Sequence, residues 1–210
     1  PDLSKNNIYD VYYIWDPSIQ TFAYHVGGPS PVSENGGSNI IGSSQAIWVQ
    51  TFANPASLVV KEKTKNSNDS WKSVNYNEVP LLNVKIIHNN FWDETKIRFI
   101  DDATENFDPL YDAKKLFSTN SSVPGVSTIA DGLNLAVNTY SLNNGNITIP
   151  IKTYVENSGN ATLEFNYLAE FPLGSCIVLE DLHTGNKYDI IDSPSLTIFL
   201  SDTTTTTHRY

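Results

Sequence analysis

Apolar and polar side chains alternate along several short runs of this sequence, and turn-forming residues separate the runs. In residues 161–168, for example, Leu163, Phe165 and Tyr167 recur at every second position. Successive side chains of a β-strand point to opposite faces of a sheet, so this spacing predicts strands with one buried face. About a dozen such runs, with turns roughly every 8–12 residues, predict an all-β fold. We expect an antiparallel β-sandwich, and the spacing leaves open whether its strands follow a jelly-roll or an immunoglobulin-like order.

Breaks in this alternation suggest how the chain is divided. Residues 27–42 are rich in glycine and proline, which predicts a long surface loop. Asparagine and charged residues at 89–94 predict a longer loop between two strands at 81–87 and 95–100. Pro150 cannot donate a backbone hydrogen bond, so it predicts that its strand either lies at a sheet edge or contains a bulge.

The length of 210 residues fits one large β domain or two small ones. Residues 63–80 are mostly polar and lack a hydrophobic period, so we predict a polar connection there. Residues 81–210 would then form the β-sandwich domain. Residues 1–62 would form either an N-terminal β subdomain or the first part of the same sandwich.

The charge and composition exclude several kinds of partner. A net charge of −10 argues against binding to nucleic acid and to anionic membrane surfaces. No apolar run approaches the roughly 20 residues that a transmembrane helix needs, so we expect no membrane insertion. A single cysteine, Cys176, rules out an internal disulfide and leaves the cellular compartment open.

Acidic residues are concentrated in one stretch that follows a predicted strand. Because neighbouring carboxylates repel one another, a compensating group is expected close by. Turn N–H groups, Lys114 and Lys115, or a bound Ca²⁺ could each supply it. The spacing differs from an EF-hand, so calcium stays an alternative to a solvated loop with Asx-turns. The candidate metal ligands are Asp101, Asp102, Glu105, Asp108 and Asp112.

The residues show no arrangement typical of catalysis. The four histidines are isolated in the sequence, and no nucleophile, phosphate-loop or dinucleotide motif occurs. Nothing singles out two of the 23 acidic residues as a catalytic pair. We therefore predict that the protein is not an enzyme.

Trp92 is the aromatic residue best placed for ligand binding, because the predicted loop would expose it. Its neighbours Asn90 and Asp93 could bond sugar hydroxyls while the indole face packs on a sugar ring. These three residues are the candidate glycan-binding site.

Residues 97–116 contain the pattern D-D-A-T-x-x-F-D-x-x-Y-D-A-x-K-L, and further characteristic segments are residues 11–17, 35–40 with 45–50, 133–138 and 178–185. These segments resemble the β-sandwich region near the C-terminus of secreted and cell-surface proteins of Bacteroidota, which precedes a sorting domain of the type IX secretion system. The most specific part of the resemblance is the block Ala103-Thr104, Phe107-Asp108 and Tyr111-Asp112-Ala113.

The resemblance implies an extracellular or cell-surface location and a structural or adhesive role. The upstream segment and the sorting tail of that region are not in this sequence, so a fragment or processed piece is expected. The family context offers no catalytic residues. Asp202-Thr203-Thr204 matches the O-glycosylation pattern of that phylum, which makes Thr203 the candidate attachment site.

Together these observations predict a non-enzymatic extracellular structural or adhesion module of a bacterial surface or secreted protein. Its partners would be protein chains or neighbouring domains of a surface assembly, met by strand addition at an open edge such as the one near Pro150. The alternative is a carbohydrate-binding β-sandwich domain that uses exposed aromatics, with or without Ca²⁺.

Overall fold

The computed structural model describes residues 4–28, 30–42, 44–61, 79–141, 145–171, 174–200 and 208–210. These residues form sixteen β-strands and one short 3-10 helix, Leu168–Glu170, and they contain no α-helix. The prediction of an all-β protein is confirmed. None of the described residues forms a helix with the length and hydrophobicity that a membrane crossing requires.

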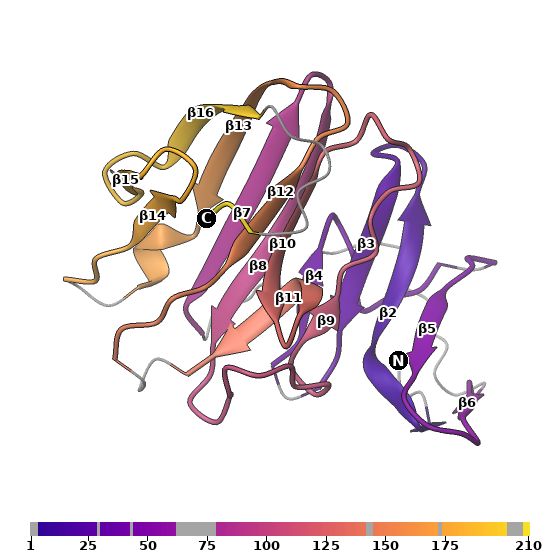
Figure 1. The fold of residues 1–210 in the computed structure, drawn as a ribbon. Coiled ribbons are helices and arrows are strands. Elements are labelled where there is room, and N and C mark those ends of the chain that lie inside the picture. The colour runs from indigo at the N-terminus through magenta and orange to yellow at the C-terminus, as the bar shows by residue number, and fades with distance from the viewer. Residues whose placement is uncertain are drawn as a thin grey trace.

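One large, curled sheet of eight strands dominates the molecule (Figure 1). Its strands run in the order β12-β10-β11-β8-β7-β13-β16, and β9 pairs with β11 beside this path. Most neighbours are antiparallel, but β8 and β11 are parallel. The bounds are β7 Leu81–His88, β8 Phe91–Phe99, β9 Ala113–Lys114, β10 Gly125–Ala130, β11 Leu133–Tyr140, β12 Ile151–Tyr154, β13 Gly159–Asn166 and β16 Ser195–Leu200.

The first part of the chain forms a smaller sheet in the order β4-β3-β2-β5, drawn in the indigo and violet colours of Figure 1. Two further strand pairs, β1-β6 and β14-β15, complete the described structure. The bounds are β1 Ser4–Asn6, β2 Ile8–Asp16, β3 Thr21–Val26, β4 Val32–Glu34, β5 Trp48–Thr51, β6 Ser57–Val59, β14 Val178–Asp181 and β15 Asn186–Asp189.

Two apolar clusters follow from the alternation along these strands. The larger one includes Val84 of β7, Ile97 of β8 and Leu163 of β13, all of which are buried. The second joins Tyr13 and Tyr24 of the small sheet to neighbours in β9 and β11 of the large sheet. The N-terminal strands therefore pack directly on the large sheet.

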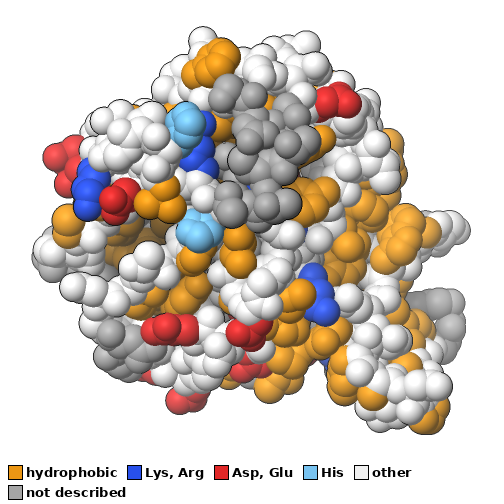
Figure 2. Space-filling view, in the orientation of Figure 1, with side chains coloured by type: hydrophobic (Ala, Val, Ile, Leu, Met, Phe, Trp, Pro, Cys, Tyr) orange, Lys and Arg blue, Asp and Glu red, His pale blue; other side chains and the backbone are white. Residues whose placement is uncertain are grey.

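Exposed apolar side chains also occur around β5, at one end of the small sheet, and around the neighbouring strand β6 (Figure 1). Phe52, Val59 and Val60, which lie in and around β5 and β6, are each about half exposed or more. Orange side chains are visible at the lower right of Figure 2, where these strands lie in Figure 1.

Three local expectations can be compared with the strands. The edge position predicted from Pro150 is confirmed, because β12 begins at the next residue and ends the sheet. The long loop predicted at residues 27–42 is interrupted by β4, whose pairing with β3 buries Glu34.

The predicted loop at 89–94 is only a tight turn at Asn89 and Asn90, since His88 already pairs with Phe91. Most of the predicted connection at 63–80 lies outside the described residues.

Candidate functional site

The most conspicuous polar feature is a buried charge network between the two sheets. The ammonium of Lys115 lies 2.9 Å from Oε1 of Glu34 and 2.8 Å from Oδ1 of Asp93. It also donates to the backbone carbonyl of Glu94 at 2.6 Å. The side chains of Lys115 and Glu34 are fully buried. Since Glu34 belongs to β4 and Asp93 to β8, this one ammonium joins the small sheet to the large one.

A second ion pair extends this network along β8. Glu94 accepts hydrogen bonds from Lys96 at 3.0 Å, from the side chain of Asn83 at 3.0 Å and from the backbone N–H of Asn35 at 2.8 Å. Asp93 also accepts the backbone N–H of Val126 at 3.0 Å. These donors give most of the buried carboxylate oxygens a partner, as buried charge requires.

Glu34 is the carboxylate of the network with the fewest hydrogen-bond partners. Its Oε2 atom is buried and has no hydrogen-bond partner among the described residues. Burial raises the pKa of Glu34 to about 8, although Lys115 opposes the shift. Burial alone would lower the pKa of Lys115, but Asp93 and Glu34 outweigh it and hold that pKa above its ordinary value. A proton on Glu34 would leave two carboxylates facing two ammonium groups.

The acidic stretch divides into exposed and buried members. Asp101, Asp102 and Glu105 are exposed, whereas Asp112 is buried. The two carboxylate oxygens of Asp112 accept the backbone N–H groups of Asp108 at 2.7 Å and of Thr139 at 2.8 Å. Burial raises the pKa of Asp112 to about 7, and these N–H groups oppose the shift.

Asp108 makes the local bond that an Asx-turn requires, because its Oδ1 accepts the N–H of Leu110 at 2.9 Å. The described part of the chain holds no group of three or more His, Cys, Asp or Glu side chains that could bind a metal. Backbone N–H groups thus offset part of the repulsion between carboxylates that the sequence predicted in this stretch.

Calcium is not expected to change the thermal stability of the protein. Both oxygens of Asp112 already accept backbone N–H groups, so an ion would have to displace them. Melting curves in excess Ca²⁺ and in EDTA should therefore share one midpoint. A higher midpoint in Ca²⁺ would show selective binding to the folded state and would establish the predicted site.

The three candidate glycan-binding residues do not converge. Trp92 lies within β8, half buried, with the ammonium of Lys85 4.4 Å from its ring centre. Asp93 is buried in the charge network, and Asn90 is exposed in the turn. Neighbouring residues of a strand point to opposite faces, which separates Trp92 from Asp93.

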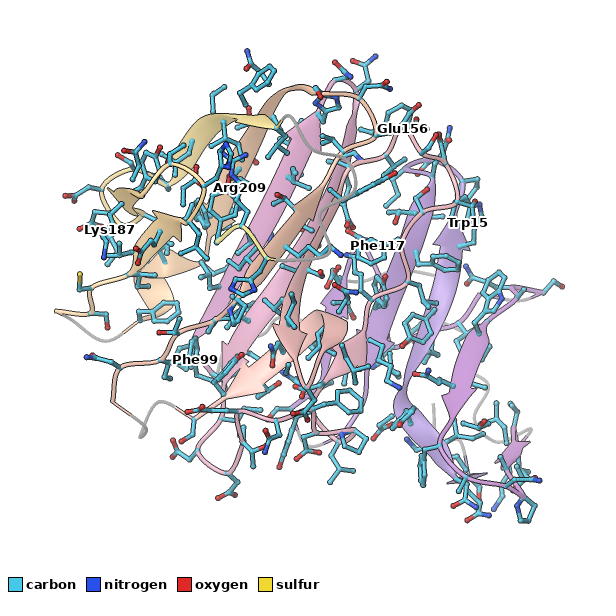
Figure 3. All side chains as sticks on the ribbon, viewed as in Figure 1. Trp15, Phe99, Phe117, Glu156, Lys187 and Arg209 are labelled. Atoms are coloured by element: carbon cyan, nitrogen blue, oxygen red, sulfur yellow. The ribbon has the colours of Figure 1, made fainter. Side chains whose placement is uncertain are left out.

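Asn90 lines a small polar hollow at the end of the β7-β8 hairpin. Its volume is about 160 Å³, and Glu156 and Asn157 form part of its wall. Figure 3 labels Glu156 at this end of the large sheet. Amides and a carboxylate around a hollow can bond hydroxyl groups, so a glycan site in this region remains a prediction. Thr203, the candidate glycosylation site, lies outside the described residues.

β16 offers a different kind of site, because it ends the large sheet opposite β12. The N–H of Phe165 donates to the carbonyl of Pro194 at 2.8 Å, which fixes the hydrogen-bonding register with β13. In an antiparallel pair, alternate residues direct both backbone groups toward the partner strand. Ser195, Thr197 and Phe199 therefore direct theirs away from β13.

This outer edge of β16 carries no charged side chain and no proline. Phe199 is 58% exposed, while Ile198 and Leu200 point into the core. No strand of the described residues pairs with the outer edge. Proteins commonly protect such edges because they can pair with another chain. We define Ser195, Thr197 and Phe199 as the β16 edge.

Comparisons with protein-family models, with curated proteins and with solved structures found no match for this chain. The fold therefore defines it only as an all-β protein.

Proposed function

We propose that this chain is a non-enzymatic structural or adhesion module of a bacterial surface or secreted protein. It would join protein partners by strand addition at the β16 edge. The observation that carries this proposal is the row of outward backbone groups on Ser195, Thr197 and Phe199, with which no strand of the described residues pairs. Among these groups, the carbonyl of Phe199 accepts a hydrogen bond from the side chain of Arg209. An added strand gains main-chain hydrogen bonds there, and the exposed ring of Phe199 offers a side-chain contact.

The charge network supports a structural role for the rest of the molecule. Lys115 joins two sheets through fully buried contacts, so the network is closed to a substrate. A scaffold held in this way can present the β16 edge in a fixed position. We also propose an extracellular location, which follows from the resemblance to the Bacteroidota region.

Replacing Thr197 by proline should abolish adhesion through the β16 edge. Beads coated with the wild-type protein are expected to cluster, since the edge of one copy can pair with that of another. Thr197→Pro removes an outward N–H but no bond to β13, so the fold should melt near the wild-type midpoint. Clustering should be measured by light scattering.

Thr197→Ala is the matched control, because it shortens the same side chain and keeps the backbone N–H. Its beads should cluster like the wild type. Equal clustering of the proline variant, or dispersed wild-type beads, would contradict strand addition at this edge.

The second candidate function is glycan binding at the polar hollow beside Asn90. A glycan array would favour it if the wild type bound sugars and Asn90→Ala lost that binding. Trp92→Ala tests the site predicted from the sequence, in which the indole face packs on a sugar ring.

A further inference from the structure

Residues 208–210 lie as a short extended segment against the edge of β12. The backbone N–H of Ile151 donates to the carbonyl of Tyr210 at 2.6 Å, and its carbonyl accepts N–H groups from Arg209 and Tyr210. On the other side, Leu182 donates its N–H to the carbonyl of Arg209 at 2.9 Å. The segment thus covers part of the edge that Pro150 predicted to be open.

The side chains of Arg209 and Tyr210 are both held by the residues around them. Arg209 donates from Nε and Nη2 to the two carboxylate oxygens of Asp181, at 2.9 and 2.8 Å, and from Nη1 to the carbonyl of Phe199 at 2.9 Å. Tyr210 is 6% exposed and belongs to the large apolar cluster. Figure 3 shows Arg209 between the β14-β15 hairpin and the large sheet, whereas Lys187 lies on the outside of that hairpin.

Asp181 is held in place by bonds other than those to Arg209. Its carboxylate also accepts the backbone N–H of His183 and the hydroxyl of Thr184, both at 3.0 Å. The hairpin turn therefore fixes the carboxylate that receives the guanidinium. A bidentate arginine–carboxylate pair together with a buried aromatic ring is a combination typical of binding hot spots.

We define the Arg-Tyr groove by Ile151, Asp181, Leu182 and Phe199. We propose that this groove is a peptide-docking site that is occupied by the chain's own residues 208–210 and also accepts residues 208–210 of a second copy. The contacts would be the same in both cases, so the local concentration of the segment decides between them. The sequence allows exchange, because residues 201–207 separate the segment from β16.

A complementation experiment tests this proposal with full-length chains. Arg209→Ala/Tyr210→Ala gives an acceptor with an intact groove and no anchors. Asp181→Asn gives a donor with intact anchors and a weakened groove. At concentrations too low for pairing through the β16 edge, each variant alone should be monomeric by chromatography with light scattering, and an equimolar mixture should form a complex of twice the mass. A mixture that stays monomeric would overturn the proposal.

The matched control is a donor that also carries Arg209→Ala, which should not pair with the acceptor. Circular dichroism of each variant checks that it is folded. The experiment can be repeated with Thr197→Pro in both chains. Pairing should persist there, which separates the Arg-Tyr groove from the β16 edge and from the function proposed above.

A peptide measurement keeps the test informative if the Asp181 variant does not fold. A fluorescent, amidated peptide matching residues 205–210 should bind the acceptor at least about tenfold more tightly than the wild type, whose own segment competes. Arginine-to-alanine in the peptide should remove binding. Tyrosine-to-phenylalanine should not weaken it, since the Tyr210 hydroxyl has no hydrogen-bond partner in the described part of the chain. Failure of the acceptor to bind, or equal binding of the alanine peptide, would overturn the proposal.

Discussion

Replacing Lys115 by methionine is expected to lower the free energy of unfolding by about 3–5 kcal/mol. Methionine fills similar space but leaves Glu34 and Asp93 buried without the ammonium that bridges them. Removing one partner of a buried ion pair is far more harmful than never having the pair, because the remaining charge stays desolvated. Urea denaturation monitored by circular dichroism measures the change.

Lys187→Met is the matched control, because Lys187 pairs with Glu180 at the surface, where both side chains are about half exposed or more. An exposed pair is worth roughly 0–1 kcal/mol, so this variant should stay close to the wild type. Adding Asp93→Asn to Lys115→Met should recover part of the loss by removing a buried carboxylate that the ammonium had paired. Equal effects of the two methionine substitutions would show that the network is not important for stability.

The stability of the wild type is expected to decrease by roughly 2 kcal/mol as the pH rises from about 6.5 to about 8. Burial raises the pKa of Glu34 from its ordinary 4.5 to about 8 and the pKa of Asp112 from 3.8 to about 7. In this window the folded protein holds protons that the unfolded chain has released. Raising the pH therefore favours unfolding.

His25 makes the dependence on pH shallower below about pH 6.5. Burial lowers the pKa of His25 to about 4, so in that range unfolding lets His25 take up a proton, which offsets one of the two protons that Glu34 and Asp112 release. Urea denaturation between about pH 6.5 and about pH 8 should show a smaller decrease of the unfolding free energy with pH in Glu34→Gln than in the wild type. Asp112→Asn should remove the part of the decrease that Asp112 causes. A slope in Glu34→Gln equal to that of the wild type would contradict the assignment to Glu34.

The sequence predicted the strands with regular alternation most accurately. Leu163 and Phe165 recur at every second position and lie in the core of β13, as expected. Pro150 placed β12 at an edge for a reason that is purely local, the missing backbone donor. Such features need only neighbouring residues, so they can be recognised without knowing the rest of the fold.

The features that sequence reasoning missed depend on contacts between distant segments. β4 lies among glycine and proline residues, and its Glu34 shows no apolar pattern; pairing with β3 and the ammonium of Lys115 order it. Because the turn at Asn89 is short, Trp92 lies in a strand and not in the predicted loop, and Asp93 points inward. The parallel pairing of β8 with β11 likewise has no signature in either strand.

The long sequence separations of these contacts have a consequence for folding kinetics. The bond from Lys115 to Glu34 spans 81 residues, and the bond from the Tyr24 hydroxyl to the carbonyl of Leu116 spans 92. Large loops must close before such contacts can stabilise anything, and chains with high contact order fold slowly. β3 and β4 therefore cannot complete these contacts until the middle of the chain is in place. During that delay their apolar faces stay open to aggregation and to chaperones.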